Sequence, residues 1–470
     1  MIWVQLDAAK DGLNHVGHKG CTDLSQGNAF CVVSGENHPY VPDRFRRLCP
    51  KCGGLFMVQR DEEYIDHLVG TGVWAQRHFD TLRWGPERNV YPNGGIFAWR
   101  DLLLPGFPVD AVLSLREGYT DLFEPPDWLK KQVELPQLRI KMDGQFQSES
   151  FKDRGMAYAV SEALRLQLYH QSFIRILCCA STGDTSAAAA VYGGYVRDRF
   201  ATIVFVPHGK VSTAQLFQAL AHGALVLSIE HPEGFDACMR FIEWYCEQNP
   251  ELYLVNSENP FRIVGQETCA LEICQDYGWE VPDWIAIPCG NGGNLTSFLV
   301  SLLRMRDRAM IPRLPGIIVA QIKGANTLVR WGRSGFQVFD PGEPQPSIAS
   351  AMNIQRAVSF PRIAQLHKEF RLGFFDVGED DIQRTRMLFM NGGANICPQS
   401  AVALDAVLQA RQDGIVREGD RVVAISTASG MKFVDSGLSY HEESARGNKP
   451  LVVEGNVQAI TEAIAKFEMA

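Results

Sequence analysis

Residues 284–303 of the chain read WIAIPCGNGGNLTSFLVSLL. The apolar run 284–288 is typical of a buried strand, and the segment 294–307 predicts a helix, so the glycine-rich loop 288–294 joins a strand directly to a helix. The three glycines let backbone N–H groups approach an anion, and the start of a helix adds a favourable electrostatic potential. A phosphate is the natural occupant of such a loop, although a tight packing turn produces the same pattern.

Strand-like and helix-like segments alternate along the chain from about residue 110 onward. Six short apolar runs are typical of buried strands: 174–180, 202–207, 224–229, 284–288, 316–322 and 422–427. The segments between them have the length of crossover helices: 153–167, 185–196, 212–221, 235–247, 262–277 and 294–307. This alternation predicts an α/β protein with parallel sheets.

The composition is that of an ordinary soluble enzyme with two or three domains. The 470 residues are 46% hydrophobic, and the net charge is −9. Neither value points to nucleic acid or an anionic membrane as a partner. The first residues lack the features of a signal peptide, no apolar run is long enough to cross a bilayer, and the 12 cysteines are scattered. We therefore expect a cytoplasmic protein with reduced thiols.

Two further loops and one lysine could carry chemistry. Residues 180–186 (ASTGDTS) could hold a carboxylate, although taken alone an ordinary capped helix start is the simpler explanation. Residues 426–430 (STASG) end a strand, where a hydroxyl could face a ring nitrogen. Lys152 lies just before a predicted helix, where a lysine is ordinarily a solvated surface charge. Ligands of open α/β sheets gather at the carboxyl ends of strands, so these segments are the expected site.

Taken in order, these segments resemble those of one enzyme family. SESFKDRGM (148–156) is similar to the S-F-K-D-R-G segment of fold-type II pyridoxal-phosphate enzymes, in particular threonine synthases. ASTGDTSAA, GNGGN and STASGMKF follow in that family's order, and VNSENPFRIVGQET (255–268) resembles its plant-type branch. The resemblance covers roughly residues 95–440, and four ordered motifs are much harder to obtain by chance than one.

The resemblance implies a tryptophan synthase β-like fold with two open parallel-sheet domains. We expect an N-terminal extension in residues 1–105. The large domain, which binds pyridoxal phosphate, would comprise residues 106–160 and 255–470, and the small α/β domain would comprise residues 161–254. A homodimer is expected from the family alone.

The resemblance also implies a role for each motif. Lys152 would hold pyridoxal 5'-phosphate as a Schiff base and shuttle protons. The cofactor phosphate would bind Gly290, Asn291, Gly292, Gly293 and Asn294, and Thr427 would hydrogen-bond to the pyridine nitrogen. The substrate carboxylate would lie among Ser181, Thr182, Gly183 and Thr185. Asp184 would lie near the phenolic oxygen of the cofactor, where an ionised carboxylate would repel a phenolate, so we expect a shared proton or a carboxylate that points away.

Threonine synthases convert O-phosphohomoserine and water to threonine and phosphate, so the resemblance implies a carbon–oxygen lyase acting on this small molecule. The substrate phosphate requires a second anion site. Arg154 is our first candidate, followed by the segment 256–259 with Lys210 and Arg262 near its flanks, although any one of these cations is more ordinarily part of a surface ion pair.

Other functions remain open at this stage. A related enzyme of the same fold, such as cysteate synthase or threonine dehydratase, would keep every cofactor motif and differ in the substrate pocket. A non-catalytic protein on this scaffold would have no need for both Lys152 and an intact phosphate loop. A nucleotide-binding dehydrogenase would require a G-x-G-x-x-G pattern, whose spacing GNGGN lacks.

The N-terminal region contains half of a zinc-ribbon signature. Cys49-Pro-Lys-Cys52 is a knuckle whose thiolates could share one face of a metal. Cys21 and Cys31 form no second C-x-x-C, so we favour a metal-free turn and assign no metal ligand.

Overall fold

The computed structural model describes residues 28–31, 37–39, 48–49, 54–72, 95–181 and 183–468. The chain divides into two compact units, Met1–Lys432 and Phe433–Ala470. The second unit contains two helices, α16 (Val434–Glu443) and α17 (Val457–Glu468). Within the described ranges, no helix combines the length and the apolar character that a membrane crossing requires.

The larger sheet of the first unit has six strands in the order β12-β11-β10-β13-β5-β4. The strands are β4 (Leu122–Phe123), β5 (Leu138–Met142), β10 (Trp284–Pro288), β11 (Gly316–Ile322), β12 (Leu372–Val377) and β13 (Val422–Ser426). β4 runs antiparallel to β5, and every other neighbouring pair is parallel. Since β10 and β13 are parallel neighbours, the loops that follow them start from the same edge of the sheet.

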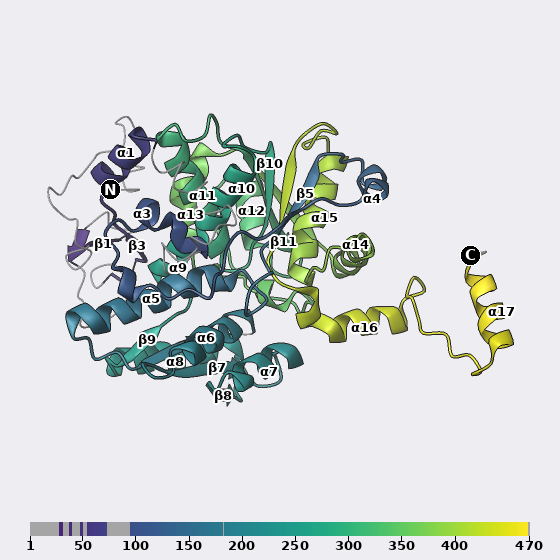
Figure 1. Cartoon of the computed structure of the whole chain (residues 1–470), viewed down its shortest axis with the longest axis horizontal. Coiled ribbons are helices and arrows are strands. Elements are labelled where there is room, and N and C mark those ends of the chain that lie inside the picture. The colour runs from purple at the N-terminus through teal and green to yellow at the C-terminus, as the bar shows by residue number, and fades with distance from the viewer. Residues whose placement is uncertain are drawn as a thin grey trace, which may run out of the picture. The chain divides into compact units, whose positions relative to one another are not determined.

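The smaller sheet has four parallel strands in the order β8-β7-β6-β9. Its strands are β6 (Ile176–Ala180), β7 (Ala201–Pro207), β8 (Leu225–Ile229) and β9 (Leu252–Leu254). Figure 1 shows three helices gathered around it: α6 (Asp184–Tyr195), α7 (Thr213–Ala221) and α8 (Phe235–Gln248). The two sheets confirm the predicted α/β class with parallel strands, whereas the domain limits stay a prediction.

The remaining helices of the first unit connect and cover these sheets. The α-helices are α1 (Glu62–Gly70), α3 (Arg100–Leu103), α4 (Asp127–Gln132), α5 (Lys152–His170), α9 (Pro260–Gln266), α10 (Thr268–Asp276), α11 (Gly293–Asp307), α12 (Thr327–Arg333), α13 (Phe360–Leu366), α14 (Glu379–Asn391) and α15 (Pro398–Gln412). Short 3-10 helices are η3 (Gly95–Trp99), η4 (Val109–Ala111), η5 (Ser350–Met352), η6 (His367–Glu369) and η7 (Gly430–Phe433).

Both faces of the large sheet are buried. Ile285 and Ile287 of β10 belong to one hydrophobic cluster together with residues of α11, whereas Trp284 and Ala286 belong to a second cluster together with residues of α15. This alternation follows the two-residue period of a strand. Because neither face meets water, the parallel strands read as continuous apolar runs in the sequence.

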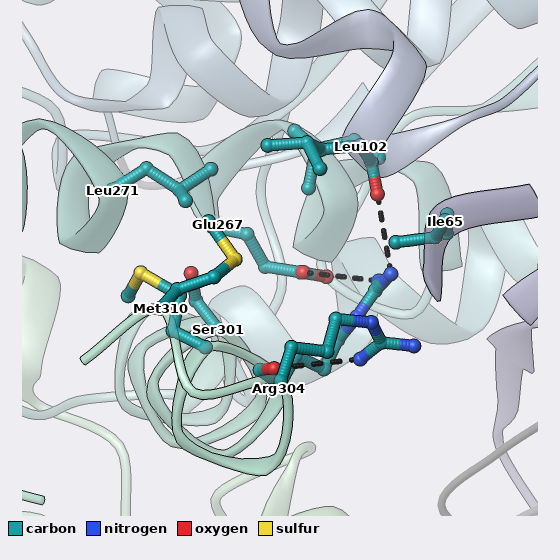
Figure 2. A pocket seen from close by; sticks show the side chains of 10 residues that line it. Ile65, Leu102, Glu267, Leu271, Ser301, Arg304 and Met310 are labelled. Carbon is teal, nitrogen blue, oxygen red and sulfur yellow. Dashed lines mark hydrogen bonds and ion pairs between the residues drawn. The ribbon is translucent and has the colours of Figure 1, made fainter. Parts of the chain in front are cut away.

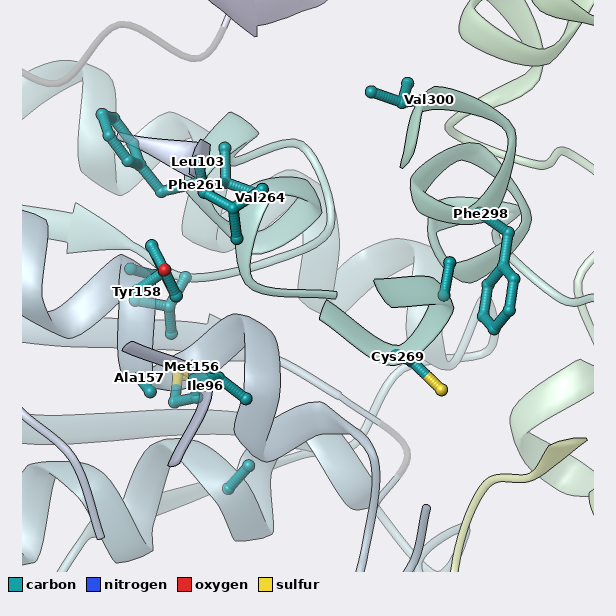
Figure 3. Close-up of a cluster of buried hydrophobic side chains, with 14 of the residues drawn as sticks. Ile96, Leu103, Met156, Ala157, Tyr158, Phe261, Val264, Cys269, Phe298 and Val300 are labelled. Atoms are coloured by element: carbon teal, nitrogen blue, oxygen red, sulfur yellow. The ribbon is translucent and has the colours of Figure 1, made fainter. Parts of the chain in front are cut away.

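Helices α5 and α9 pack so closely that glycine is required at their contact. A Cβ atom at Gly265 would lie 2.0 Å from the carbonyl oxygen of Arg154, and one at Gly155 would lie 2.8 Å from that of Arg262. Tyr158 of α5 and Phe261 of α9 belong to the larger hydrophobic cluster, which Figure 3 shows. The close contact holds the first turn of α5 against α9.

The predicted helix over 262–277 is wrong as a single element, because the chain forms α9 and α10 with a break at Glu267. The backbone N–H of Glu267 is shared between the carbonyl oxygens of Ile263 and Val264, at 3.1 and 3.3 Å. Such shared hydrogen bonds are common at helix ends. The carboxylate of Glu267 is bound by Arg60 through two hydrogen bonds of 3.0 and 2.6 Å.

The described N-terminal residues form a small antiparallel sheet and a helix. The strands β1 (Asn28–Cys31), β2 (Asn37–Pro39) and β3 (Phe56–Val58) lie in the order β2-β1-β3. After β3, Arg60 makes the ion pair with Glu267 described above. Beside this pair, Arg304 of α11 donates to the carbonyl oxygen of Leu102 at 3.2 Å. Figure 2 shows Arg304, Leu102 and Glu267 around one pocket. The extension is therefore anchored by buried charges.

Candidate active site

Lys152 is the first residue of α5, and its loop is tied to the end of β13. The backbone N–H of Phe151 donates to the carbonyl oxygen of Thr427 at 2.8 Å, and that of Ser429 donates to the carbonyl oxygen of Glu149 at 3.0 Å. The structure therefore brings together the lysine motif and the 426–430 loop, although about 275 residues of sequence separate them.

The amine of Lys152 lies in a buried environment. Its Nζ is 3.9 Å from the centroid of the Phe151 ring. Burial, followed by the nearby cation of Arg262, lowers the pKa of Lys152 to about 7, even though the carboxylate of Asp184 acts in the opposite direction. A large fraction of this amine is therefore uncharged near neutral pH, which is the state a nucleophile or general base requires.

Thr427 lies at the end of β13 and is almost completely buried. Its backbone N–H donates to Ser400 Oγ at 2.9 Å, and its Oγ1 lies 3.7 Å from the Sγ atom of Cys397. Ser400 and Cys397 at the start of α15 thus hold Thr427 in place. Sequence reasoning missed both residues, because only the packing of α15 on the sheet brings them to β13.

The glycine-rich loop has the close-packed geometry that its sequence predicts. Gly292 has a φ of +78°, which favours glycine, and a Cβ atom there would lie 2.6 Å from Ile363 Cδ1. A Cβ atom at Gly290 would lie 2.8 Å from the carbonyl oxygen of Ala351. Asn291 accepts a 3.0 Å backbone hydrogen bond from Ser359. α11 then begins at Gly293, as predicted for a strand–loop–helix unit.

Helix α9 lies between Lys152 and the glycine-rich loop. A Cβ atom at Gly155, one turn into α5, would lie 2.6 Å from Arg262 Nε. On the other side, a Cβ atom at Gly293 would lie 3.6 Å from Ile263 Cδ1 and 3.7 Å from Gln266 Oε1. The lysine motif and the glycine-rich loop therefore contact Arg262 and Ile263, which are consecutive residues of α9.

The 180–186 loop follows β6 and leads into α6. Ser181 Oγ accepts a 2.9 Å hydrogen bond from the N–H of Gly183, so this hydroxyl orders the loop itself. Thr185 is half-buried in the first turn of α6. Thr182 lies outside the described residues, so its predicted contact with the substrate carboxylate stays a prediction.

The surroundings of Asp184 favour its ionised form. Burial alone would raise its pKa, but the ammonium group of Lys432 and hydrogen bonds from Lys432 and Gln215 bring the pKa below its usual value. Lys432 Nζ lies 2.9 Å from Asp184 Oδ1, and Gln215 Nε2 donates to the same oxygen at 2.7 Å. Asp184 thus forms an ion pair with Lys432, and the expected shared proton, or a carboxylate that points away from the cofactor, stays a prediction. Lys432 was part of the STASGMKF motif, but nothing in its local sequence indicated that it would be buried.

Arg154 does not reach the site, contrary to our first choice for the second anion site. Its guanidinium group is fully buried and donates to Asp143, Glu272 and Thr268, at distances from 2.6 to 3.0 Å. Lys141 adds a second cation 3.2 Å from Glu272. Because these acceptors occupy the N–H groups of Arg154, none is left to bind a substrate phosphate.

The other candidates for that site differ in exposure and partners. Arg262 is buried, and its Nη1 donates to the carbonyl oxygen of Val255 at 2.7 Å. Its Nε and Nη2 have no hydrogen-bond partner within the described part of the chain. Asn256 holds the end of β6 through both atoms of its amide, at 2.9 and 2.7 Å from Ala180, and Lys210 is exposed. Among these candidates, Arg262 is thus the buried cation with N–H groups available to bind a phosphate.

Of the two cysteines in the C-x-x-C knuckle, the structure describes Cys49. Cys49 is buried beside Phe56, and its N–H donates to the carbonyl oxygen of Gly54 at 2.8 Å. Cys21 and Cys52 lie outside the described residues, and only the backbone of Cys31 is described. Across the ranges that the structure covers, no group of three His, Cys, Asp or Glu side chains could hold a metal.

Comparison with known proteins agrees with this arrangement. The family model described as "Pyridoxal-phosphate dependent enzyme" matches residues 113–428. "Threonine synthase 2, chloroplastic" of Arabidopsis thaliana is 34% identical over 422 residues, which is 88% of this chain and 80% of the relative. The threonine synthase of Methanocaldococcus jannaschii is 29% identical over 88% of this chain and 95% of its own length.

The chain belongs to the threonine synthase family of pyridoxal-phosphate-dependent enzymes.

The fold agrees with this family membership. The crystal structure of threonine synthase from Escherichia coli matches with a TM-score of 0.62 over 94% of this chain and 100% of that one. At 18% identity, this similarity concerns the fold, and it confirms the fold-type II architecture expected from the motifs.

The described residues fit pyridoxal phosphate. The glycine-rich loop packs where side chains at Gly290 or Gly292 would clash with Ala351 or Ile363, and it opens a helix of 15 residues whose start favours an anion. Asn294 is buried at the start of that helix, and its Nδ2 has no partner among the described groups, which leaves a donor for a phosphate oxygen. Lys152 supplies a buried amine for the aldehyde, and Thr427 supplies a hydroxyl nearby.

The Arg154 network allows a test of stability that is separate from activity. Arg154→Met leaves Asp143 and Glu272 buried with less compensation, and removing one partner of a buried ion pair costs about 3–5 kcal/mol. As a control, Arg384→Ala breaks an exposed pair with Asp381 and should cost less than about 1 kcal/mol. Urea unfolding of the two variants measures the difference. Equal midpoints would show that Arg154 is not the counter-ion we describe.

Proposed function

We propose that this protein is a threonine synthase that converts O-phosphohomoserine and water to threonine and phosphate. The observation that carries the proposal is the buried amine of Lys152, with a pKa near 7, at a point where loops from both sheets meet. Bound pyridoxal phosphate supplies an electron sink that lets weakly acidic C–H protons be removed from an amino-acid substrate. The family relatives named above support the choice of substrate.

Lys152 is proposed to hold the cofactor and then to move protons. When the amine of Lys152 is free, its lowered pKa would let it accept a proton near neutral pH. The same amine can return that proton at a neighbouring carbon of the substrate.

The remaining cofactor and substrate contacts are proposed from their positions. Gly290, Asn291, Gly292, Gly293 and Asn294 would bind the cofactor phosphate, and Thr427 would contact the ring nitrogen. The loop of Ser181, Thr182, Gly183 and Thr185 would hold the substrate carboxylate beside Asp184. These roles are supported by the shared edge of the sheet that bears β10 and β13 and by the anchoring of the Lys152 loop on Thr427.

Arg262 is proposed to bind the substrate phosphate in place of Arg154. Its Nε and Nη2 are buried donors without a partner in the described chain, and its cation acts directly on Lys152. A phosphate can accept two parallel N–H bonds from a guanidinium group, and a substrate that lacks the phosphate offers no acceptor at that position. Arg262 would therefore favour a phosphorylated substrate over an unphosphorylated one.

The substrate assay tests the function directly. The protein should release phosphate and form threonine from O-phosphohomoserine, and it should do so far more slowly with O-phosphoserine. Lys152→Ala should lose the visible absorbance of the cofactor-linked amine and reduce turnover by at least about 100-fold, because both the link and the proton carrier are removed. Lys131→Ala, at an exposed helix position, is the control and should behave as the parent.

Two results would contradict this function. A Lys152→Ala variant that keeps the absorbance and the activity would exclude Lys152 as the cofactor lysine. Preference of the parent for O-phosphoserine would instead indicate a cysteate synthase, and deamination of threonine would indicate a threonine dehydratase.

The Arg262 assignment can be tested by kinetics at saturating cofactor. Arg262→Met should lower kcat/KM for O-phosphohomoserine by about 10-fold to 100-fold, the effect of losing a charge-assisted hydrogen-bond pair of about 1.5–3 kcal/mol. Inhibition by inorganic phosphate should weaken in parallel. Arg262→Lys keeps the positive charge but lacks the planar guanidinium group, so its kcat/KM should lie between those of the parent and Arg262→Met. Unchanged phosphate inhibition in Arg262→Met would place the anion site elsewhere.

We also propose a homodimer and a cytoplasmic location. Both are supported by family membership and composition alone, and one named relative is chloroplastic. Light scattering of the purified chain should give twice the monomer mass of 52.4 kDa. A mass equal to the monomer would contradict the dimer.

A further inference from the structure

Lys432 is a second buried lysine beside the Lys152 site. Its side chain is 1% exposed, and its Nζ lies 2.9 Å from Asp184 Oδ1 and 2.7 Å from the carbonyl oxygen of Ser148. Asp184 starts α6 after β6 of the small sheet, Ser148 precedes Lys152, and Lys432 follows β13 of the large sheet. One ammonium group therefore joins three of the segments that form the site.

The neighbours of this ion pair hold it in one geometry. Ser212 Oγ donates to the carbonyl oxygen of Lys432 at 3.1 Å and lies 2.9 Å from Gln215 Oε1. The Nε2 of Gln215 donates to Asp184, and that of Gln218 donates to the carbonyl oxygen of Ser148 at 3.1 Å. Helix α7 and its N-cap residue thus contact Lys432, Asp184 and Ser148. The Lys432–Asp184 ion pair is therefore held in place by surrounding hydrogen bonds.

A buried carboxylate in this position needs a counter-ion. Asp184 is 7% exposed, and it acts electrostatically on Lys152. An isolated carboxylate in such surroundings would take up a proton or bind the nearest ammonium group. Without Lys432, the nearest available ammonium would be Lys152 itself, whose amine must be uncharged to react.

We propose that Lys432 is a positioning residue of the active site: it neutralises the Asp184 carboxylate and holds it on the side of the site away from proton exchange with Lys152. The carboxylate then stays ionised next to the cofactor edge without adding a net negative charge there. This role rests on Lys152 as the cofactor lysine, which the Lys152→Ala variant tests separately.

The charged groups around Lys152 determine whether replacing Lys432 or Asp184 raises or lowers the pKa of Lys152. Arg262 and Lys432 lower the pKa of Lys152, and Asp184 raises it. The carboxylate of Asp153, next in sequence, is bound by the N–H of Ser148 at 2.9 Å and also lies within electrostatic reach of Lys432. Removing Lys432 should therefore leave Asp184 to stabilise the protonated amine of Lys152, while removing the Asp184 charge should act in the opposite direction.

The test measures how fast the apoprotein captures pyridoxal phosphate as a function of pH, because capture requires the uncharged amine. Lys432→Met should move the midpoint of this profile to higher pH by about one unit, as expected for an unopposed neighbouring charge. Asp184→Asn should move it to lower pH. The double variant Asp184→Asn/Lys432→Met should return close to the parent profile, and Lys432→Arg, which keeps the charge, should move it least.

The melting temperature of each apoprotein separates this role from simple packing. A purely structural Lys432 would lower the melting temperature of Lys432→Met and leave the midpoint unchanged, which would overturn the proposal. A double variant whose midpoint departs further from the parent than either single variant would also overturn it. If Lys432→Met does not fold, the proposal is tested by the other two variants. The capture midpoint should move to lower pH in Asp184→Asn and return towards the parent value in the double variant.

Discussion

The backbone hydrogen bond from Phe151 to Thr427 is the contact on which the site depends. It fixes the residue before Lys152 to Thr427, which follows β13, with a length of 2.8 Å. Since β13 is the parallel neighbour of β10, the same contact sets Lys152 relative to the edge from which the glycine-rich loop starts. The close packing of α5 on α9, which requires glycine at Gly155 and Gly265, then limits how far the amine can move.

Burial strengthens the effect of each charged group on the pKa values of its neighbours at this site. Lys152 has a lowered pKa because its amine is out of water and faces Arg262, whereas Asp184 stays ionised because Lys432 is its partner. Arg154 shows the other outcome of burial: its donors are matched by Asp143 and Glu272, so it stabilises the fold and contributes no free donor. The difference between a binding cation and a structural cation is thus whether buried acceptors already surround it.

Much of the fold could be predicted from local pattern. The strands β10 and β11 have the predicted bounds, and the helix predicted from 294 begins one residue earlier at Gly293. Apolar runs covered on both faces carry a strong local signal. The helix predicted over 262–277 failed at Glu267, where the ion pair with Arg60, which is distant in sequence, coincides with the break. Short strands such as β9 were also missed, because three residues carry too little periodicity.

For the site, the sequence alone determined which motifs are present, because the spacing of small residues, glycines and one lysine is a property of the chain itself. It could not decide between Arg154 and Arg262, nor find Lys432 as the partner of Asp184. Those answers depend on which acceptors lie within about 3 Å of a buried charge. Only the tertiary structure decides this, because packing of α5, α7 and α9 brings together residues that are far apart in sequence.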